Sequence, residues 1–367
     1  MPIRVAIAGV GNCASALVQG LGYYGSRDQT EGLIFPVIGP WSVADIEVVA
    51  AFDIDRRKVG YSLRHAIFSP PNCALQFSEP PCFADSVTVE MGPVHDGVAQ
   101  HMAEYPDDEA FRPASRPPVA IAERLHDTQA DILVSYMPVG ADDAARAYAA
   151  ACLDAGVAMV NCSPTFIASD PDWAARFTAR QVPIVGDDVK SQFGATITHR
   201  VLSRLAEERG IRIKRTYQLN VGGNSDFLNM LSRERLVSKK KSKTNAVQSQ
   251  LKEPLSAKDI HIGPSDYIPW LQDNKVCFLR IEGTGFGGVD MNVELRLSVQ
   301  DSPNSAGVVV DAIRSAMLAR DRGHVGPVDA PCAYLMKSPP MQCSDDEARR
   351  AMSSFVVSSD RSARDAH

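Results

Sequence analysis

The stretch from Ile3 to Leu21 constrains the fold more than any other part of this sequence. A short apolar segment, Ile3–Ala8, runs directly into Gly9-Val-Gly-Asn-Cys-Ala14, and residues 16–21 then follow a helical pattern. In a turn of the form G-x-G-x-x-A, the first glycine permits a tight bend, the second lets the backbone approach a pyrophosphate, and the small third residue allows close helix packing. The order strand, turn, helix therefore predicts a dinucleotide-binding unit. The predicted cofactor contacts in this turn are Gly9, Gly11, Asn12, Cys13 and Ala14.

A second apolar segment supports the same unit. Residues 46–52 form an apolar run that ends in Asp53, and an acidic residue at this place binds the adenosine ribose hydroxyls in dinucleotide-binding folds. Asp53 lies 39 residues after Ala14, whereas the usual gap is about 20 residues, so we expect an insertion over residues 23–41. The alternative is that Asp53 only caps the end of its strand.

Strand and helix signals alternate through the first half of the chain. Residues 66–117 contain many prolines, which indicate irregular structure with short strands. Alternation of apolar strands with helices is typical of a Rossmann-type doubly wound α/β domain, whose ligands lie at the carboxyl ends of the strands. Beyond residue 117, we predict strands at 131–136, 157–161 and 182–185 and a helix at 142–155.

The pattern changes after Gly194. A helical run is followed by long strand-like segments, and residues 289–299 alternate apolar and polar side chains, as in a sheet with one solvated or interface face. We therefore expect a second, α+β domain inserted into the first. The predicted limits are 1–195 for the dinucleotide-binding domain, 196–305 for the inserted domain, 306–350 for a return to the first domain, and 351–367 for a disordered tail.

The composition limits the classes of function. The chain has 367 residues, of which 45% are hydrophobic and 22% charged, as in a globular protein of two or three domains. A net charge of −6 argues against a nucleic-acid partner, because binding the phosphate backbone needs a broad basic face. The N-terminus lacks the layout of a signal peptide, and no apolar run approaches the ~18 residues of a membrane span. We therefore expect a cytoplasmic protein with no membrane partner.

A lysine cluster stands out against the acidic background. It follows the polar turn Asn220–Asp226 and occupies residues 238–244, Ser-Lys-Lys-Lys-Ser-Lys-Thr. Lys239 and Lys243 are four residues apart, so on a helix they share one face and together bind a phosphate well, while the two lysines between them point elsewhere. The alternative is an ordinary solvated lysine face.

Six motifs occur in order along the chain. They are Gly9-Val-Gly-Asn-Cys-Ala-Ser15, Gly186-Asp-Asp-Val-Lys-Ser191, Asn220-Val-Gly-Gly-Asn-Ser-Asp-Phe-Leu-Asn229, Ser238-Lys-Lys-Lys-Ser-Lys-Thr244, Asp301-Ser-Pro-Asn-Ser-Ala-Gly307 and Leu335-Met-Lys-Ser-Pro-Pro340. With these motifs the sequence resembles, from about residue 3 to residue 340, the inositol-phosphate synthases, in particular their short actinobacterial branch. The resemblance implies that the first domain binds NAD, that the chain returns to it near the C-terminus, and that the middle domain forms a homotetramer and much of the active site.

The resemblance also implies a reaction. D-Glucose 6-phosphate is converted to 1D-myo-inositol 3-phosphate, the first step of inositol biosynthesis. NAD oxidises C5, an enolate attacks the C1 aldehyde in an intramolecular aldol cyclisation, and the same NADH reduces the ketone, so that no net NADH appears. The sequence offers cations for a phosphate and for developing oxyanions, and carboxylates to position them.

Matching motifs assign roles to single residues. The resemblance implies that Lys239 handles the proton of the C5 hydroxyl, that Lys243 holds the phosphate, and that Lys275 and Lys337 serve the phosphate and the C1 oxygen respectively. The aspartates orient these lysines, with the alternative that Asp188 or Asp301 faces a divalent or monovalent cation. The implied catalytic set is Lys239, Lys275, Lys337, Asp188, Asp226 and Asp301, the phosphate contacts are Lys243 and Asn220, and Asp188 and Ser302 add to the cofactor contacts.

Two other functions stay open at this point. One is an NAD-dependent dehydrogenase of a phosphorylated sugar, with net transfer of hydride. The other is a catalytically silent NAD-binding homologue. Net formation of NADH separates the first from a redox-neutral synthase, and absence of any turnover identifies the second.

Overall fold

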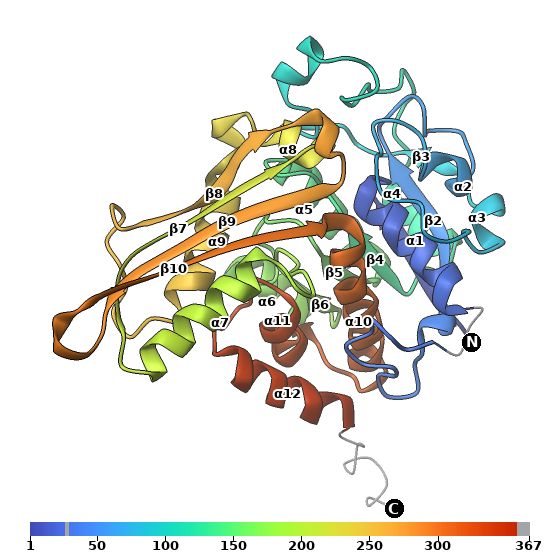
Figure 1. Ribbon diagram of the computed structural model, residues 1–367. Helices are drawn as coiled ribbons and strands as arrows, with labels where there is room; N and C mark the ends of the chain where they lie inside the picture. Colours follow the sequence, from blue (N-terminus) through green and yellow to red (C-terminus); the bar gives the residue numbers. More distant parts are fainter. Residues whose placement is uncertain (26–28, 358–367) are drawn as a thin grey trace, which may run out of the picture.

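The chain is built around two β-sheets that lie side by side and are joined by helices (Figure 1). The computed structural model describes residues 1–25 and 29–357, without the side chains of Val237, Lys239, Lys240, Pro264 and Ser265. The first sheet contains the N-terminal strand, and the second consists of long strands from the middle of the chain.

The first sheet has seven strands, and all of its neighbouring strands are parallel. The strand order is β11-β6-β5-β4-β1-β2-β3, so the order reverses between β1 and β4. Ligands bind at such a reversal in doubly wound folds, because the connections leave the sheet in opposite directions there. The strands are β1 (Ile3–Ala8), β2 (Ile46–Asp53), β3 (Val89–Met91), β4 (Ile132–Ser135), β5 (Ala158–Asn161), β6 (Pro183–Val185) and β11 (Gly326–Pro327).

Helices cover both faces of this sheet, which explains why its strands are apolar throughout. Val5 and Ile7 of β1 belong to the core under α1 (Asn12–Gly25) and α10 (Asp301–Asp321). Ala6 and Ala8 belong to the core on the other face. The helices of that face are α4 (Ile121–Asp127), α5 (Asp142–Ala155) and α6 (Pro171–Ala179). The predicted Rossmann-type α/β fold is thereby confirmed.

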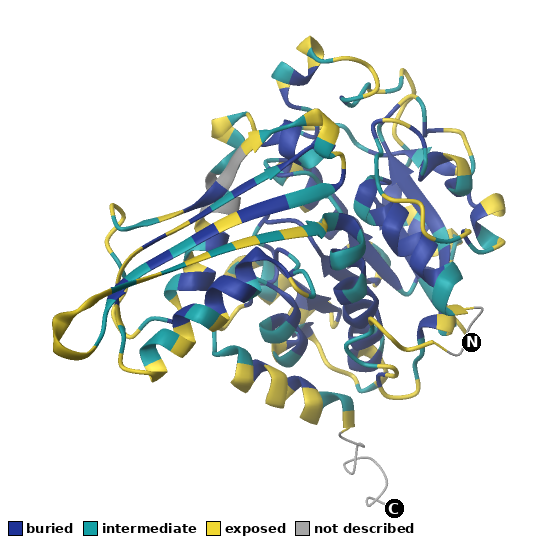
Figure 2. Ribbon diagram, in the orientation of Figure 1, coloured by how far each residue is buried: buried dark blue, intermediate teal, exposed yellow. Residues whose placement is uncertain are grey.

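The second sheet has four strands in the order β10-β9-β7-β8, of which only β7 and β8 are parallel. Its apolar face packs under α7 (Ala195–Glu208) and α9 (Val237–Gln248), and along β10 exposed residues alternate with partly buried ones (Figure 2). The predicted alternation at residues 289–299 is therefore real. The strands are β7 (Arg212–Gly222), β8 (Ile260–Tyr267), β9 (Asn274–Thr284) and β10 (Asp290–Gln300).

The chain passes from β10 straight into α10, which packs on α1 and on the first sheet. One long helix thus begins at the second sheet and ends in the core of the first. The predicted irregular region at 66–117 contains only short elements. The remaining elements are α2 (Leu63–Ala66), α3 (Phe83–Ser86), α8 (Ser225–Asn229), α11 (Asp329–Leu335), α12 (Asp345–Val357) and the 3-10 turns Val43–Asp45, Gln100–Glu104, Arg233–Leu236, Pro269–Leu271 and Phe286–Gly288.

The prediction of a disordered tail from residue 351 is wrong for residues 351–357, which are part of α12. Ala348 and Met352 of this helix are buried, and four residues apart they form one apolar face, which outweighs the polar composition of the segment. Residues 358–367 of the predicted tail lie outside the described residues. The domain limits at 195 and 305 stay predictions.

Asp345, the first residue of α12, forms ion pairs with two buried cationic side chains, Lys190 and Arg200. Its carboxylate accepts hydrogen bonds from Arg200 Nε at 2.8 Å and from Lys190 Nζ at 3.5 Å. Arg200 also donates to the carbonyl of Ala246 in α9. The ion pair therefore holds α7, α9 and α12 together.

We expect an Asp345→Asn variant to lose about 3 kcal/mol of unfolding free energy, because it leaves buried cations without their counter-charge. Urea unfolding measures this loss. The exposed neighbour in an Asp346→Asn variant is the control, and equal stability of the two variants would contradict the assignment.

Candidate active site

A cavity lies between the two sheets, where residues at the carboxyl ends of β1, β2 and β4 meet residues of α7, α8 and α9. The glycine-rich turn lines one part of it and lysine side chains line another. Among the predicted site residues, those in its wall are Gly9, Gly11, Asn12, Cys13, Asp53, Asp188, Asp226, Lys243, Lys275, Asp301, Ser302 and Lys337.

The glycine-rich turn has the geometry that a dinucleotide phosphate requires. Gly9 has φ of +91°, and a Cβ added there would lie 2.9 Å from the carbonyl oxygen of Tyr136, so the position needs glycine. A Cβ added to Gly11 would meet no atom within 4 Å, and Gly11 lines the cavity. Its backbone is therefore open to a ligand. Ala14 is not in the wall but in the core beneath, where its small side chain allows close packing of α1.

Asp53 closes the turn from the end of β2. Its Oδ2 accepts from the backbone N–H of Val10 at 2.7 Å, and its Oδ1 accepts from Ile54 and Asp55. Because a carboxylate has about four acceptor positions, these three bonds leave room for a further hydroxyl donor. Both alternatives from the sequence are thus compatible with the structure, since Asp53 caps its strand and also lines the cavity.

Lys337 and Asp188 form a buried ion pair in the wall. Lys337 Nζ donates to Asp188 Oδ1 at 2.8 Å and to the carbonyl of Val189 at 2.6 Å. The other carboxylate oxygen of Asp188 accepts from Ser242 Oγ of α9 at 2.6 Å, and Ser338 Oγ donates to Ser242 Oγ at 2.8 Å. Asp188 therefore joins the C-terminal part of the chain to α9.

A buried neighbour holds the turn that presents Asp188. Asp188 has φ of +60°, which is uncommon for a residue other than glycine. The carboxylate of Asp187 accepts from Asn161 Nδ2 at 2.7 Å and from the backbone N–H groups of Ile167, Ala168 and Ser169. These bonds anchor the turn to the loop after β5 and compensate for burial of the charge.

Lys275 and Asp301 form a second pair, with Nζ and Oδ1 3.0 Å apart. Burial acts to lower the pKa of the Lys275 ammonium, but the Asp301 carboxylate, with a contribution from Asp226, outweighs burial and raises that pKa overall. Lys275 is therefore held as a cation at neutral pH.

The lysine cluster lies on α9, as its spacing indicates. Lys243 is buried in the cavity wall, whereas Lys241 is exposed, with its ammonium 5.5 Å from the centre of the Phe166 ring. The predictions for Lys239 and Lys240 concern side chains outside the described ones. Asn220 is fully buried, donates to the carbonyl of Gly263 and is not part of the wall. This placement does not support a direct phosphate contact for Asn220, because its amide already serves to join β7 and β8.

Sequence reasoning missed three features of the site. The first turn of α7, residues 194–197, lines the cavity and provides N–H groups at the positive end of a helix dipole. Ser242 binds Asp188. Asn224 lines the cavity and is held by Asp273. Only the glycine before the helical run at 195–208 was a usable signal, since a helix starting after a glycine suggests an anion site.

Asp273 is buried behind the Lys275–Asp301 pair. Its carboxylate accepts from Asn224 Nδ2 at 3.0 Å, from Ser302 Oγ at 2.7 Å and from the Ser302 backbone N–H at 3.0 Å. Burial, and then the negative charge of Asp301, raise the pKa of Asp273 to about 6. Asp273 thus links the turn before α8 to the start of α10.

Burial also changes the pKa of the cysteine in the glycine-rich turn. It raises the pKa of the Cys13 thiol to about 12, so Cys13 lines the cavity as a neutral thiol. All eight cysteines are free thiols. In the described ranges, no group of three or more His, Cys, Asp or Glu side chains is arranged to hold a metal ion. Nor is any helix in those ranges long and apolar enough to cross a membrane.

The parallel sheet, the glycine-rich turn and the acidic end of β2 define a Rossmann-type α/β protein, here with a lysine- and aspartate-lined cavity under a second sheet. Comparison with known proteins narrows this class. The chain belongs to the inositol-phosphate synthase family, because it is 52% identical to inositol-3-phosphate synthase of Mycobacterium tuberculosis over 97% of this chain and 96% of that protein.

Other similarities agree. The family model for myo-inositol-1-phosphate synthase matches residues 194–302. Inositol-3-phosphate synthase of Corynebacterium glutamicum is 52% identical, with 97% of this chain and 98% of that protein covered. The crystal structure of a myo-inositol-1-phosphate synthase-related protein from Thermotoga maritima superimposes with a TM-score of 0.77 at 25% identity, covering 97% of this chain and 98% of that one.

The raised pKa of Asp273 gives a testable stability difference. A carboxyl group whose pKa is about 6 in the folded state, against an ordinary 3.8, contributes stability below pH 4 that is lost as the pH rises to 6. Relative to wild type, an Asp273→Asn variant should therefore become progressively more stable between pH 4 and pH 6, by up to about 3 kcal/mol. Urea unfolding of both proteins at steps of pH measures this difference, and a difference independent of pH would contradict the assignment.

Proposed function

We propose that this chain converts D-glucose 6-phosphate to 1D-myo-inositol 3-phosphate in a reaction without net redox change. The observation that carries the proposal is the shared cavity, in which the glycine-rich turn faces Lys243, Lys275 and Lys337. A dinucleotide site and a cationic phosphate site in one cavity suit a reaction that oxidises, cyclises and reduces the same sugar phosphate. The near full-length identity to inositol-3-phosphate synthases supports the same substrate.

The residues of the first domain fit NAD. Gly9 permits the tight turn and Gly11 gives the open backbone for the pyrophosphate, with Asn12 and Cys13 at the start of α1. Asp53 keeps an acceptor position for a ribose hydroxyl. Asp188 and Ser302 line the same cavity. When bound, NAD supplies an acceptor for two electrons of the sugar and gives them back.

The phosphate of the substrate is held by Lys243 and by the first turn of α7. Both line the cavity, and both present positive charge from different elements. Lys243 is buried in the wall, where a charge-assisted bond to phosphate is stronger than in water. Lys239, one turn earlier on α9, keeps its predicted role with the C5 hydroxyl.

The two lysine–aspartate pairs serve the sugar oxygens. Lys337, oriented by Asp188, stabilises the negative charge that develops on an oxygen during enolisation and aldol closure. Lys275, oriented by Asp301 and near Asp226, acts on a second oxygen or on the phosphate. Because each lysine is held by a carboxylate from another element, the charges are preorganised and need little reorientation during the reaction.

A bound divalent or monovalent cation is less well supported as a source of positive charge than the lysines are. The carboxylate of Asp188 is engaged by Lys337 and Ser242, and that of Asp301 by Lys275. The lysines thus supply the positive charge that a cation would supply.

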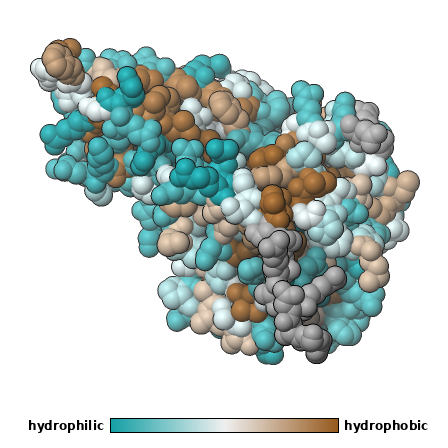
Figure 3. Space-filling model, turned by 90° about the horizontal axis from the view of Figure 1, so that it is seen from below, coloured by the Kyte–Doolittle hydropathy of each residue, from teal (hydrophilic) through white to brown (hydrophobic). Residues whose placement is uncertain are grey.

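A homo-oligomer, with a tetramer as the expected form, accounts for apolar surface on the second sheet. Seen from below, the end of this sheet projects as a lobe that shows apolar atoms (Figure 3). Phe286 and Val289, between β9 and β10, are exposed to 102% and 69%, and Phe278 within β9 is exposed to 42%. Association of copies of the chain through this sheet buries such surface. We place the protein in the cytoplasm, where its sugar phosphate substrate is found.

The decisive experiment is incubation of pure protein with glucose 6-phosphate and a catalytic amount of NAD. We expect a cyclitol phosphate to accumulate, detected by ³¹P NMR and mass spectrometry, with no net absorbance of NADH. Stoichiometric NADH would identify a dehydrogenase. Bound NAD with no conversion would identify a silent homologue, and either result overturns the proposal.

A Lys337→Ala variant tests the role of the buried pair. It should bind NAD as wild type does but lose about 10²- to 10⁴-fold in turnover, because a preorganised cation and proton donor is removed. Steady-state assays with calorimetric NAD binding measure both quantities, and the exposed Lys252 in a Lys252→Ala variant is the control. Unchanged turnover in Lys337→Ala would remove this residue from the site.

A further inference from the structure

A proline-rich part of the chain forms one end of the cavity. Residues 93–113, here named the bridge segment, follow β3 and contain only one short 3-10 turn. Pro93, Val94, Gly97 and Phe111 of this segment line the cavity on the side of Asp53 and Ile54. The bridge segment therefore closes the cavity beside the proposed ribose site.

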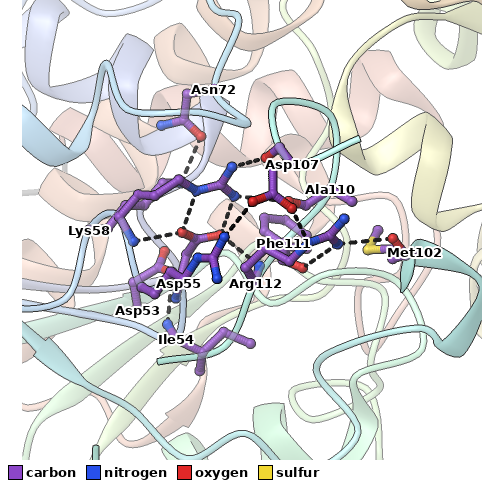
Figure 4. A network of polar contacts seen from close by, with 12 residues as sticks. Asp53, Ile54, Asp55, Lys58, Asn72, Met102, Asp107, Ala110, Phe111 and Arg112 are labelled. Carbon is purple, nitrogen blue, oxygen red and sulfur yellow. Dashed lines mark hydrogen bonds and ion pairs between the residues drawn. The ribbon is translucent and has the colours of Figure 1, made fainter. Parts of the chain in front are cut away.

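Buried and partly buried polar groups attach the bridge segment to the end of β2 (Figure 4). The fully buried carboxylate of Asp55 accepts from Arg57 Nε at 2.8 Å and from the backbone N–H of Arg112 at 2.9 Å. Arg57 also donates to the carbonyl of Ala110 at 2.8 Å. Backbone bonds from Arg56 to Arg112 and from Ala114 to Ile54 continue the contact. This end of the segment is thus fixed next to Asp53.

The middle of the bridge segment is attached to α5. The two carboxylate oxygens of Asp96 accept from the backbone N–H groups of Asp143 and Ala144, each at 3.0 Å. Asp96 thereby binds N–H groups that have no partner within the helix. Gly97, the next residue, lines the cavity.

The opposite side of the bridge segment contacts the second sheet. Ala99, Met102 and Ala110 form a buried apolar cluster with Leu228 of α8. His101 Nε2 lies 2.8 Å from the carbonyl oxygen of Leu228. Tyr267, the last residue of β8, donates its hydroxyl to Glu109 Oε2 at 2.8 Å. The segment therefore spans from the dinucleotide-binding sheet to the sheet that carries the lysines.

These contacts reach the substrate side of the cavity through α8. Asp226 and Phe227 precede Leu228 on this short helix, and both line the cavity. A displacement of the bridge segment would therefore open the cavity beside Asp53 and release its hold on α8.

The proposed reaction requires that the dinucleotide stays bound between the oxidation and the reduction of the sugar. In the first half of the reaction, C5 of the sugar loses a hydride, which is two electrons and one proton, and its hydroxyl oxygen loses a proton. In the second half, the hydride returns to C5 and a proton returns to the oxygen. The protein must hold the reduced dinucleotide between the halves, since its loss would leave a free keto sugar phosphate and net NADH.

We propose that the bridge segment retains the dinucleotide during the cycle, and that Tyr267 and His101 are positioning residues that hold the segment against α8 and β8. This inference rests on the proposed function for its purpose. In this proposal, the contacts of the bridge segment set the rate at which NADH leaves the cavity.

The test compares wild type with Tyr267→Phe, His101→Ala and the double variant. Tyr267→Phe removes one hydrogen bond and keeps its ring in the apolar cluster, whereas His101→Ala removes one hydrogen bond and the ring contact with Tyr105. We therefore expect NADH to dissociate about three- to tenfold faster, and faster still in the double variant. Bound NADH is displaced by excess NAD in a stopped-flow instrument, and its fluorescence is followed. Tyr24→Phe is the matched control, because it removes a tyrosine hydroxyl bond to the Glu31 carbonyl outside the cavity wall.

Turnover gives a second readout. With glucose 6-phosphate and NAD, the double variant should release NADH into solution for a fraction of its cycles, whereas wild type and Tyr24→Phe should not. Variants that keep the wild-type melting temperature and dissociation rate overturn the inference while the proposed function stands. Wild type that binds NADH without forming a cyclitol phosphate overturns the proposed function, and the dissociation rates then still decide whether the segment retains the dinucleotide. Wild type that binds no NADH overturns both.

Discussion

The carboxylate of Asp188 is the contact on which the site most depends. One oxygen holds the Lys337 ammonium and the other holds the Ser242 hydroxyl, so three distant parts of the sequence meet at one buried charge. An isolated carboxylate at this depth would be costly, and its partners offset that cost only when all three segments are in place. The buried turn at Asp187, fixed to the loop after β5, provides the rigid base.

Elsewhere in the cavity wall, ion pairs and hydrogen bonds also join different elements. Lys275 on β9 meets Asp301 at the start of α10, and Asp273 connects that start to Asn224 before α8. Each cation is thus neutralised by a neighbour while remaining in the wall. Asp301 holds Lys275 as a cation by raising its pKa, so the charge of Lys275 need not change when an anionic substrate enters the cavity.

The sequence alone predicts the parts of the structure that depend on local pattern. The glycine-rich turn, the apolar strands and the alternation along β10 all follow from residue spacing, and the Rossmann-type fold follows from their order. The lysine–aspartate pairing came from resemblance, and the closeness of Lys337 to Asp188 needs tertiary structure because 148 residues lie between them. Local pattern failed where packing decides, because α12 extends into a segment of polar composition and is held there by two buried side chains. Asn220 donates a hydrogen bond to the Gly263 carbonyl, and its contact with phosphate stays a prediction.

The direct passage from β10 into α10 has a mechanical consequence. Gln300 ends the strand and Asp301 begins a helix of 21 residues whose buried side chains belong to the core of the first sheet. No linker separates the two sheets at this junction, so a hinge there would have to break either the helix or the Lys275–Asp301 pair. Large domain closure of the kind seen in two-lobed binding proteins is therefore unfavourable for this molecule. Smaller displacements, of single helices or loops at the rim, would let substrate enter while leaving this helix and this ion pair intact.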